Sequence, residues 1–174
     1  MAYDYELLEV EIEGRLATVT VSNPPINLIT LPLYFELMAL SEELAADPDL
    51  TVVVMKSADP DFFLAHFDVE AILMFPTDTP AERSEQLNDF HAMCERFRTM
   101  DKVTIAQIEG RVGGGGNELA ASFDMRFGVR NRTLINQMEV PLGILPGGSG
   151  TQRLPRLVGR GRALEIILGA EDLD

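Results

Sequence analysis

The chain has 174 residues, a length that fits one domain with a hydrophobic core of its own. Its apolar share of 46% is normal for a globular protein, and no apolar run approaches the length of a membrane span. The formal net charge of −14 argues against nucleic acid as a partner, because binding it needs a basic surface, and otherwise favours solubility.

A hairpin and a helix are predicted first along the chain. Apolar residues alternate with polar ones over residues 8–13 and 17–21, which is the period of a strand, and Glu13-Gly14-Arg15 is the expected turn between them. Thr30 is a predicted helix N-cap, with Pro32 in the first turn. This helix should bury the leucines that recur at helical spacing: Leu33, Leu37, Leu40 and Leu44.

The rest of the chain alternates between predicted strands and helices. Strands are expected over residues 51–55, 103–108 and 126–129. A second long helix is expected to open at Thr79-Pro80. Its apolar stripe is Leu87, Phe90, Cys94 and Phe97, and further helices are predicted around residues 118–121, 151–158 and 162–168. The order strand, strand, helix, repeated with variations, indicates an α/β fold.

Cysteine content and the N-terminus bear on where the protein works. Cys94 is the one cysteine of the sequence, so neither an internal disulfide nor a thiolate metal cluster is expected. The first 13 residues lack the basic and then apolar layout of a signal peptide. The expected location is the cytoplasm, with no membrane and no metal involved.

Four glycines, residues 113–116, lie between a predicted strand and the predicted helix that contains Glu118. Such a tract lets the backbone approach a ligand closely, and helix N-terminal N–H groups suit a phosphate or a developing oxyanion. The tract lacks the Lys-Ser/Thr ending of a phosphate loop, so by itself it is equally compatible with a tight turn.

Three segments together are more specific than the glycine tract alone. They are residues 62–68, residues 109–120 and residues 136–154, the last of which contains Leu-Gly-Ile-Leu-Pro-Gly-Gly-Ser-Gly-Thr-Gln-Arg-Leu. With Asn23-Pro24-Pro25-Ile26-Asn27-Leu28, they resemble the crotonase family, also called the enoyl-CoA hydratase/isomerase superfamily. The resemblance runs along essentially the whole chain. It implies a spiral of strand–strand–helix turns and a coenzyme A thioester as ligand.

The resemblance also implies roles for particular residues. The backbone N–H groups of Phe67 and Gly115 would form an oxyanion hole for the thioester oxygen. Glu118 would be the base that takes a proton from water, and Glu139 the acid that protonates the carbon next to the carbonyl. Gly147 would position the water. Coenzyme A enters as part of the substrate and no further cofactor is expected; its predicted contacts are Leu28, Ala65 and His66.

The sequence departs from the family pattern at several points. His66 replaces a glycine, and we expect it to be a packed side chain of the pocket rather than a proton-transfer group. The Phe67 ring is expected to narrow the acyl pocket, and Met138 replaces a common proline before Glu139. Family members continue beyond the point that matches Asp174. Residues 1–174 are therefore interpreted as a crotonase-like core without the C-terminal helices that build a homotrimer or hexamer.

The leading hypothesis is an enoyl-CoA hydratase-like lyase of fatty acid metabolism. Because isomerases of the family commonly manage with a single acid–base residue, the Glu118/Glu139 pair favours hydration. Two alternatives stay open. One is another acyl-CoA reaction of the family, such as isomerisation, hydrolysis or carbon–carbon cleavage. The other is a catalytically silent acyl-CoA-binding homologue.

Overall fold

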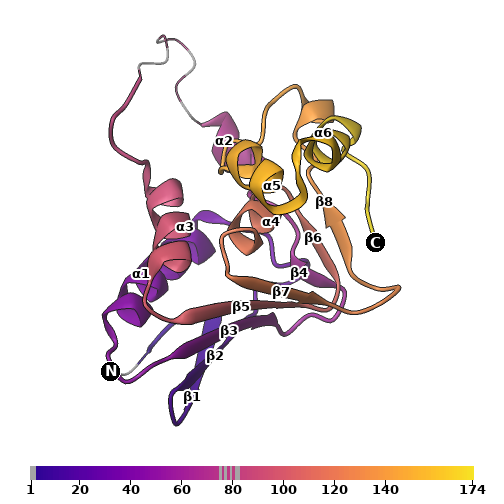
Figure 1. Ribbon diagram of the computed structural model, residues 1–174. Coiled ribbons are helices and arrows are strands. Elements are labelled where there is room, and N and C mark those ends of the chain that lie inside the picture. The colour runs from indigo at the N-terminus through magenta and orange to yellow at the C-terminus, as the bar shows by residue number, and fades with distance from the viewer. Residues whose placement is uncertain (1–2, 75, 77, 79, 81–82) are drawn as a thin grey trace.

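The computed structural model describes residues 3–74, 76, 78, 80 and 83–174 (Figure 1). Its N-terminal hairpin pairs β1 (Leu8–Glu13) with β2 (Leu16–Val21), in the register that joins Glu13 to Leu16. Gly14 opens the turn at a φ of 61°, a left-handed conformation that glycine adopts without steric cost. The alternating pattern predicted this hairpin correctly.

A five-stranded sheet forms the base of the molecule, in the order β1-β2-β3-β5-β7. β3 (Val52–Ser57), β5 (Val103–Ile108) and β7 (Met125–Gly128) run parallel to β2. One face of this sheet is closed by the core, whose members from β2 are Ala17, Val19 and Val21, none of them exposed. The predicted strands at 51–55, 103–108 and 126–129 correspond to β3, β5 and β7.

Each of the last three strands of this sheet passes into a short strand of a second sheet. β4 (Phe62–Leu64) follows β3, β6 (Arg111–Gly113) follows β5, and β8 (Leu134–Asn136) follows β7. The three short strands are parallel, in the order β4-β6-β8, and cross the base sheet steeply in Figure 1. Successive strand–strand–helix turns thus stack beside one another, which confirms the spiral α/β fold.

Helices cover the same side of the base sheet. α1 (Leu31–Ala46) begins after Thr30 and buries all four predicted leucines completely. α3 (Asp89–Thr99) packs beside α1, and α4 (Gly114–Ala120) is buried over its whole length. α5 (Gly150–Val158) and α6 (Arg160–Gly169) form a smaller apolar cluster with each other through Leu154, Ala163 and Ile166.

Several element boundaries differ from the prediction. The second long helix begins at Asp89, not at Pro80, because the side chain of Asn88 caps it by accepting a hydrogen bond from His91 N–H at 2.9 Å. Thr79 lies outside the described residues. α4 begins inside the glycine tract, four residues before Glu118, and a short helix α2 (Val69–Leu73) was not predicted.

Two further features fall outside the regular layers. A single 3₁₀ turn, η1 (Val140–Leu142), follows Glu139. The chain end returns to the small sheet, where Leu173 pairs antiparallel with Ile135. In the part of the chain that the structure describes, no helix combines the length and the apolar character needed to traverse a lipid bilayer.

Candidate active site

The candidate site lies where three parallel strands end at the same edge of the small sheet. Residues 65–67 follow β4, the glycine tract continues beyond β6, and residues 137–139 follow β8. Carboxyl ends of parallel strands are the usual place for ligand binding in α/β proteins. The three segments that stand out in the sequence are therefore brought together.

The glycine tract packs directly against the loop that follows β4. A Cβ built on Gly115 would lie 3.0 Å from Phe67 Cβ and 3.5 Å from Phe67 N. One built on Gly116 would lie 2.5 Å from the carbonyl oxygen of Leu64. These positions have no room for a side chain, which explains why the strand-to-helix turn is made of glycine.

The backbone N–H groups of Phe67 and Gly115 belong to the two residues that meet at this close contact. Ile29 N–H donates to His66 O at 2.9 Å and Asp68 N–H donates to Ile29 O at 3.0 Å, which leaves Phe67 N–H pointing to the other side of the bridge. Within residues 3–74 and 83–174, Phe67 N–H donates no hydrogen bond. Gly115 is the second residue of α4, a position whose N–H has no partner inside the helix. Both groups are available to an oxygen that gains negative charge.

Glu118 is held by a nest of backbone N–H groups formed by residues 148–150. Its side chain is only 3% exposed, and its Oε2 and Oε1 accept hydrogen bonds from Gly148 N–H at 2.9 Å and Gly150 N–H at 2.7 Å. Ser149, between the two donors, has the left-handed φ of 90° that makes alternate N–H groups converge on an anion. Burial raises the pKa of Glu118 to about 7 although both N–H groups lower it.

Glu139 is also buried, at 7% exposure, and is oriented by a neighbouring amide. Gln137 Nε2 donates to both carboxylate oxygens, at 2.9 and 3.0 Å, and Gln137 Oε1 accepts from Asn117 Nδ2 at 2.8 Å. Burial raises the pKa of Glu139 above its ordinary value, and the Gln137 amide opposes the rise. Asn117 precedes Glu118 on α4, so one chain of hydrogen bonds links both glutamate segments.

The two carboxyl groups influence each other electrostatically. The Glu139 charge is a further cause of the raised pKa of Glu118, after burial. Two carboxylates in one buried region resist ionising together, so the pair retains a proton at a pH at which isolated carboxyls would have lost theirs. A proton donor and a proton acceptor are thereby available in the same region at neutral pH.

The other predicted site residues lie around this centre. Gly147 accepts a hydrogen bond at its carbonyl oxygen from His91 Nε2 at 2.7 Å and adjoins the nest. Ala65 is buried, and its carbonyl lies against Gly113. Leu28 is half-buried, and its carbonyl accepts from Asn23 Nδ2 at 2.8 Å, which holds the segment in place.

His66 has a backbone partner and faces Glu139. Its Nδ1 lies 2.8 Å from the carbonyl oxygen of Phe67, and since a carbonyl only accepts, Nδ1 carries the hydrogen. A Cβ built on Gly114 would lie 3.3 Å from His66 Cβ and 3.2 Å from Glu139 Oε1. The side chain therefore forms part of the wall beside the second glutamate.

An aromatic cluster of Tyr34, Phe67 and Phe90 borders the site. Their ring centroids are 5.7 Å (Tyr34–Phe67), 6.1 Å (Tyr34–Phe90) and 6.0 Å (Phe67–Phe90) apart, which is within the range of favourable aromatic pairs. Phe90 also touches the nest, because a Cβ built on Gly148 would lie 2.6 Å from its ring. The sequence drew attention to the Phe67 ring but not to Tyr34 or Phe90 in this role.

Sequence reasoning missed the residues that orient the two glutamates: Asn117, Gln137, Gly148, Ser149 and Gly150. One signal was present. Gln137 lies two positions before Glu139, and in extended chain such residues point to the same side. Nothing in the sequence indicated which glycines of residues 147–150 would donate hydrogen bonds to Glu118. For metals, the described part of the chain contains no group of three or more His, Cys, Asp or Glu side chains able to hold an ion.

Comparison with known proteins gives a consistent result. Residues 11–174 match the family model described as enoyl-CoA hydratase/isomerase. The chain is 31% identical over 170 residues to the probable enoyl-CoA hydratase of Bacillus subtilis (strain 168), covering 95% of this chain and 63% of that protein. It is 33% identical over 166 residues to the fatty acid oxidation complex subunit alpha of Shewanella loihica, covering 93% of this chain but 23% of that protein.

Solved structures agree with the sequence comparison. The crystal structure of enoyl-CoA hydratase from Bacillus anthracis superposes with a TM-score of 0.84 at 25% identity, over 97% of this chain and 64% of that one. The chain thus spans less than two thirds of the length of each of these three relatives.

Proposed function

Because the chain belongs to the enoyl-CoA hydratase/isomerase family, we propose that it adds water across the double bond of a 2-enoyl-coenzyme A thioester. The observation that carries this proposal is the pair of buried, separately oriented carboxyl groups, Glu118 and Glu139, beside the glycine tract. Acyl-CoA is thus the proposed ligand, and coenzyme A enters only as part of it.

In the proposed reaction the thioester carbonyl oxygen accepts hydrogen bonds from the N–H groups of Phe67 and Gly115. Addition of water to C3 puts negative charge on that oxygen, and two fixed donors stabilise the resulting enolate. Losing one such donor typically costs about 10²–10³ in rate. Only the backbone of Phe67 takes part, which leaves its ring free to shape the acyl pocket.

The two glutamates divide the proton transfers. The pair reacts when its shared proton lies on Glu139. Ionised Glu118 then takes a proton from the attacking water as the water oxygen bonds to C3, and protonated Glu139 delivers a proton to C2. The C2–C3 double bond becomes a single bond and the product is a 3-hydroxyacyl thioester. Glu118 must then pass its proton back to Glu139, directly or through water, before the next turnover. A pKa of about 7 suits Glu118 to accepting and releasing a proton near neutral pH.

Substitution of each carboxyl group tests the proposal. Glu118→Gln and Glu139→Gln should each lower the hydration rate by about 10²–10⁴, the usual contribution of a positioned acid or base. Thioester affinity should change little. The assay is the loss of conjugated absorbance over a panel of short, long and aromatic 2-enoyl-CoA thioesters.

The control is Glu165→Gln, which removes a carboxylate of α6 that is paired with Arg162 on the surface. Its turnover should match the unchanged protein. If Glu139→Gln turned over at the wild-type rate, the two-carboxylate mechanism would be wrong. Conversion of 3-enoyl to 2-enoyl thioesters without hydration would instead identify an isomerase.

A further inference from the structure

Ser149 holds a backbone conformation that serine rarely adopts. Its φ of 90° and ψ of 7° lie in the left-handed region, which costs a residue with a Cβ more than it costs glycine. Such strain persists only where neighbouring contacts impose it. Ser149 is itself buried, at 8% exposure, and it separates the two N–H groups that grip Glu118.

Arg153 is the contact that fixes Ser149. Its Nε donates to Ser149 Oγ at 2.7 Å, and its guanidinium also donates to Glu95 Oε1 at 2.6 Å. The arginine is 9% exposed and its bond to Ser149 is buried, whereas the Glu95 side chain is 35% exposed. Glu95 belongs to α3, so Arg153 connects this helix to the segment that holds Glu118.

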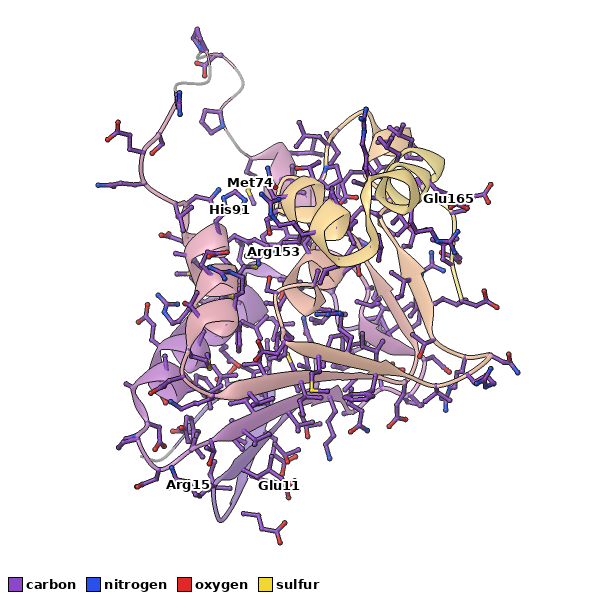
Figure 2. The ribbon with its side chains drawn as sticks, in the orientation of Figure 1. Glu11, Arg15, Met74, His91, Arg153 and Glu165 are labelled. Atoms are coloured by element: carbon purple, nitrogen blue, oxygen red, sulfur yellow. The ribbon has the colours of Figure 1, made fainter. Side chains whose placement is uncertain are left out.

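α3 holds the same segment at a second point. His91 lies one helical turn before Glu95, on the same face, and donates from Nε2 to the carbonyl oxygen of Gly147 at 2.7 Å. Figure 2 labels His91 on α3 and Arg153 on α5, on the facing sides of these helices. The segment 147–150 is therefore tied to one face of α3 at two points, directly at Gly147 and through Arg153 at Ser149.

We propose that Arg153 is a positioning residue for Glu118: by holding Ser149 in the left-handed conformation, it keeps the N–H groups of Gly148 and Gly150 on the two carboxylate oxygens. The carboxylate is thereby fixed in orientation, with its remaining lone pairs directed away from the nest. The catalytic consequence rests on the proposed function, since orientation matters to rate only if Glu118 handles the proton of water.

The groups that face Glu118 can be separated experimentally. They are Glu139 beyond β8, Arg153 on α5 and the Cys94 thiol on α3. Burial raises the pKa of Cys94 to about 11, so this thiol is neutral throughout the working range. Arg153 acts both through its charge and through Ser149. Removing only the serine hydroxyl leaves the charge and the Glu95 ion pair in place, and therefore isolates the positioning effect.

The decisive variants are Ser149→Ala and Ser149→Gly. Ser149→Ala loses the acceptor for Arg153 but keeps a Cβ that disfavours positive φ, so kcat should fall by about 10- to 100-fold with little change in KM. Ser149→Gly loses the same hydroxyl, yet glycine enters the left-handed region freely, and should recover most of the lost rate. A role for the hydroxyl in chemistry or packing would impair both variants equally and would overturn the inference.

A second measurement does not depend on turnover. The titration of Glu118 is followed by NMR in protein labelled with ¹³C at glutamate carboxyls, and its signal is assigned as the one missing from Glu118→Gln. In Ser149→Ala the titration midpoint of Glu118 should rise by about one pH unit, the scale of a lost charge-assisted hydrogen bond. It should return toward the wild-type midpoint in Ser149→Gly. An unchanged midpoint in Ser149→Ala would overturn the inference.

Two controls complete the test. Arg162→Met removes an exposed arginine paired with Glu165 on α6 and should leave both the rate and the Glu118 midpoint unchanged. If the unchanged protein hydrated none of the enoyl thioesters, the proposed function would fail. The Glu118 titration would still decide whether Arg153 and Ser149 position the carboxylate.

Discussion

The base sheet and the small sheet of this protein differ in how their strands are built. The base sheet has five strands of four to six residues, and buried side chains alternate along its three central strands, β2, β3 and β5. The small sheet has three strands of three residues each. Yet the residues proposed for the oxyanion hole and the proton transfers lie just beyond these short strands, at positions 65–67, 114–118 and 137–139.

The difference shows that stability and chemistry are drawn from different parts of one spiral. Side chains of the base sheet contribute apolar burial, so their identity matters through volume and hydrophobicity. The small sheet aligns three chain segments at one edge, and its neighbours meet backbone to backbone through glycine. A larger side chain at these glycines should therefore displace the aligned segments, whereas in the base sheet it should mainly change the stability. Four predictions test this contrast.

The largest effect is expected where the small sheet begins. A Cβ built on Gly110 would lie 2.2 Å from the carbonyl carbon and oxygen of Asp61, which is backbone that cannot swing aside. Gly110→Ala should therefore destabilise the fold by about 3 kcal/mol or more, the upper range of overpacking effects. Urea unfolding measures the loss. A variant as stable as the unchanged protein would show that β4 and β6 can separate freely.

The second effect concerns the buried carboxyl of Glu118. Its pKa rises from 4.5 in the unfolded chain to about 7 in the fold, so the folded state binds the extra proton between these values. The unfolding free energy therefore falls as pH rises through this window, and the contribution of the Glu118 proton is fully lost above the folded pKa.

The measurable quantity is the difference between the wild type and Glu118→Gln. From pH 5 to pH 8, the unfolding free energy of the wild type should fall relative to the variant by about 2 to 3 kcal/mol. Urea titrations of both proteins at several pH values give this difference. Parallel pH dependences would mean that Glu118 is ionised in the fold, against its burial.

The sequence predicted the base sheet better than the small sheet for a physical reason. Alternation over Leu8–Glu13 and along β2 is long enough to establish a period of two, and the leucines of α1 repeat over about three turns. A strand of three residues shows at most one alternation. β6 and β8 were therefore not predicted, and neither was the small sheet that brings their ends together.

The sequence offered candidate members of the site but none of the contacts that connect them. Glu118, Glu139, Gly115 and Phe67 were singled out by resemblance, and the structure brings their segments to one edge. The nest at Gly148 and Gly150 depends on a positive φ at Ser149, a residue that carries no local signal for that conformation. Long-range contacts of this kind arise only from the tertiary fold.

The third prediction uses a side chain of the base sheet. Val53 is fully buried on β3, the central strand of the base sheet, so Val53→Ala should remove about 2 kcal/mol of stability through lost burial and an unfilled cavity. Because it is remote from the small-sheet edge, kcat per folded molecule should stay unchanged. Urea unfolding measures the stability, and the hydration assay measures kcat under conditions in which the variant is fully folded. A fall in kcat there would contradict the proposed division between the two sheets.

The smallest effect is expected at an open glycine of α6. Gly161 has a helical position, a φ outside the left-handed region and no atom within 4 Å of a built Cβ, in contrast to Gly110. Gly161→Ala should stabilise the protein by about 0.5 kcal/mol, mainly because alanine has fewer conformations to lose on folding. Differential urea unfolding against the wild type measures this gain, and hydration activity should not change. A loss of stability here would show that the exposed start of α6 packs against another surface in solution. The same substitution, glycine to alanine, thus has opposite signs in the two places because only at Gly110 does a neighbouring backbone already fill the space of the added methyl group.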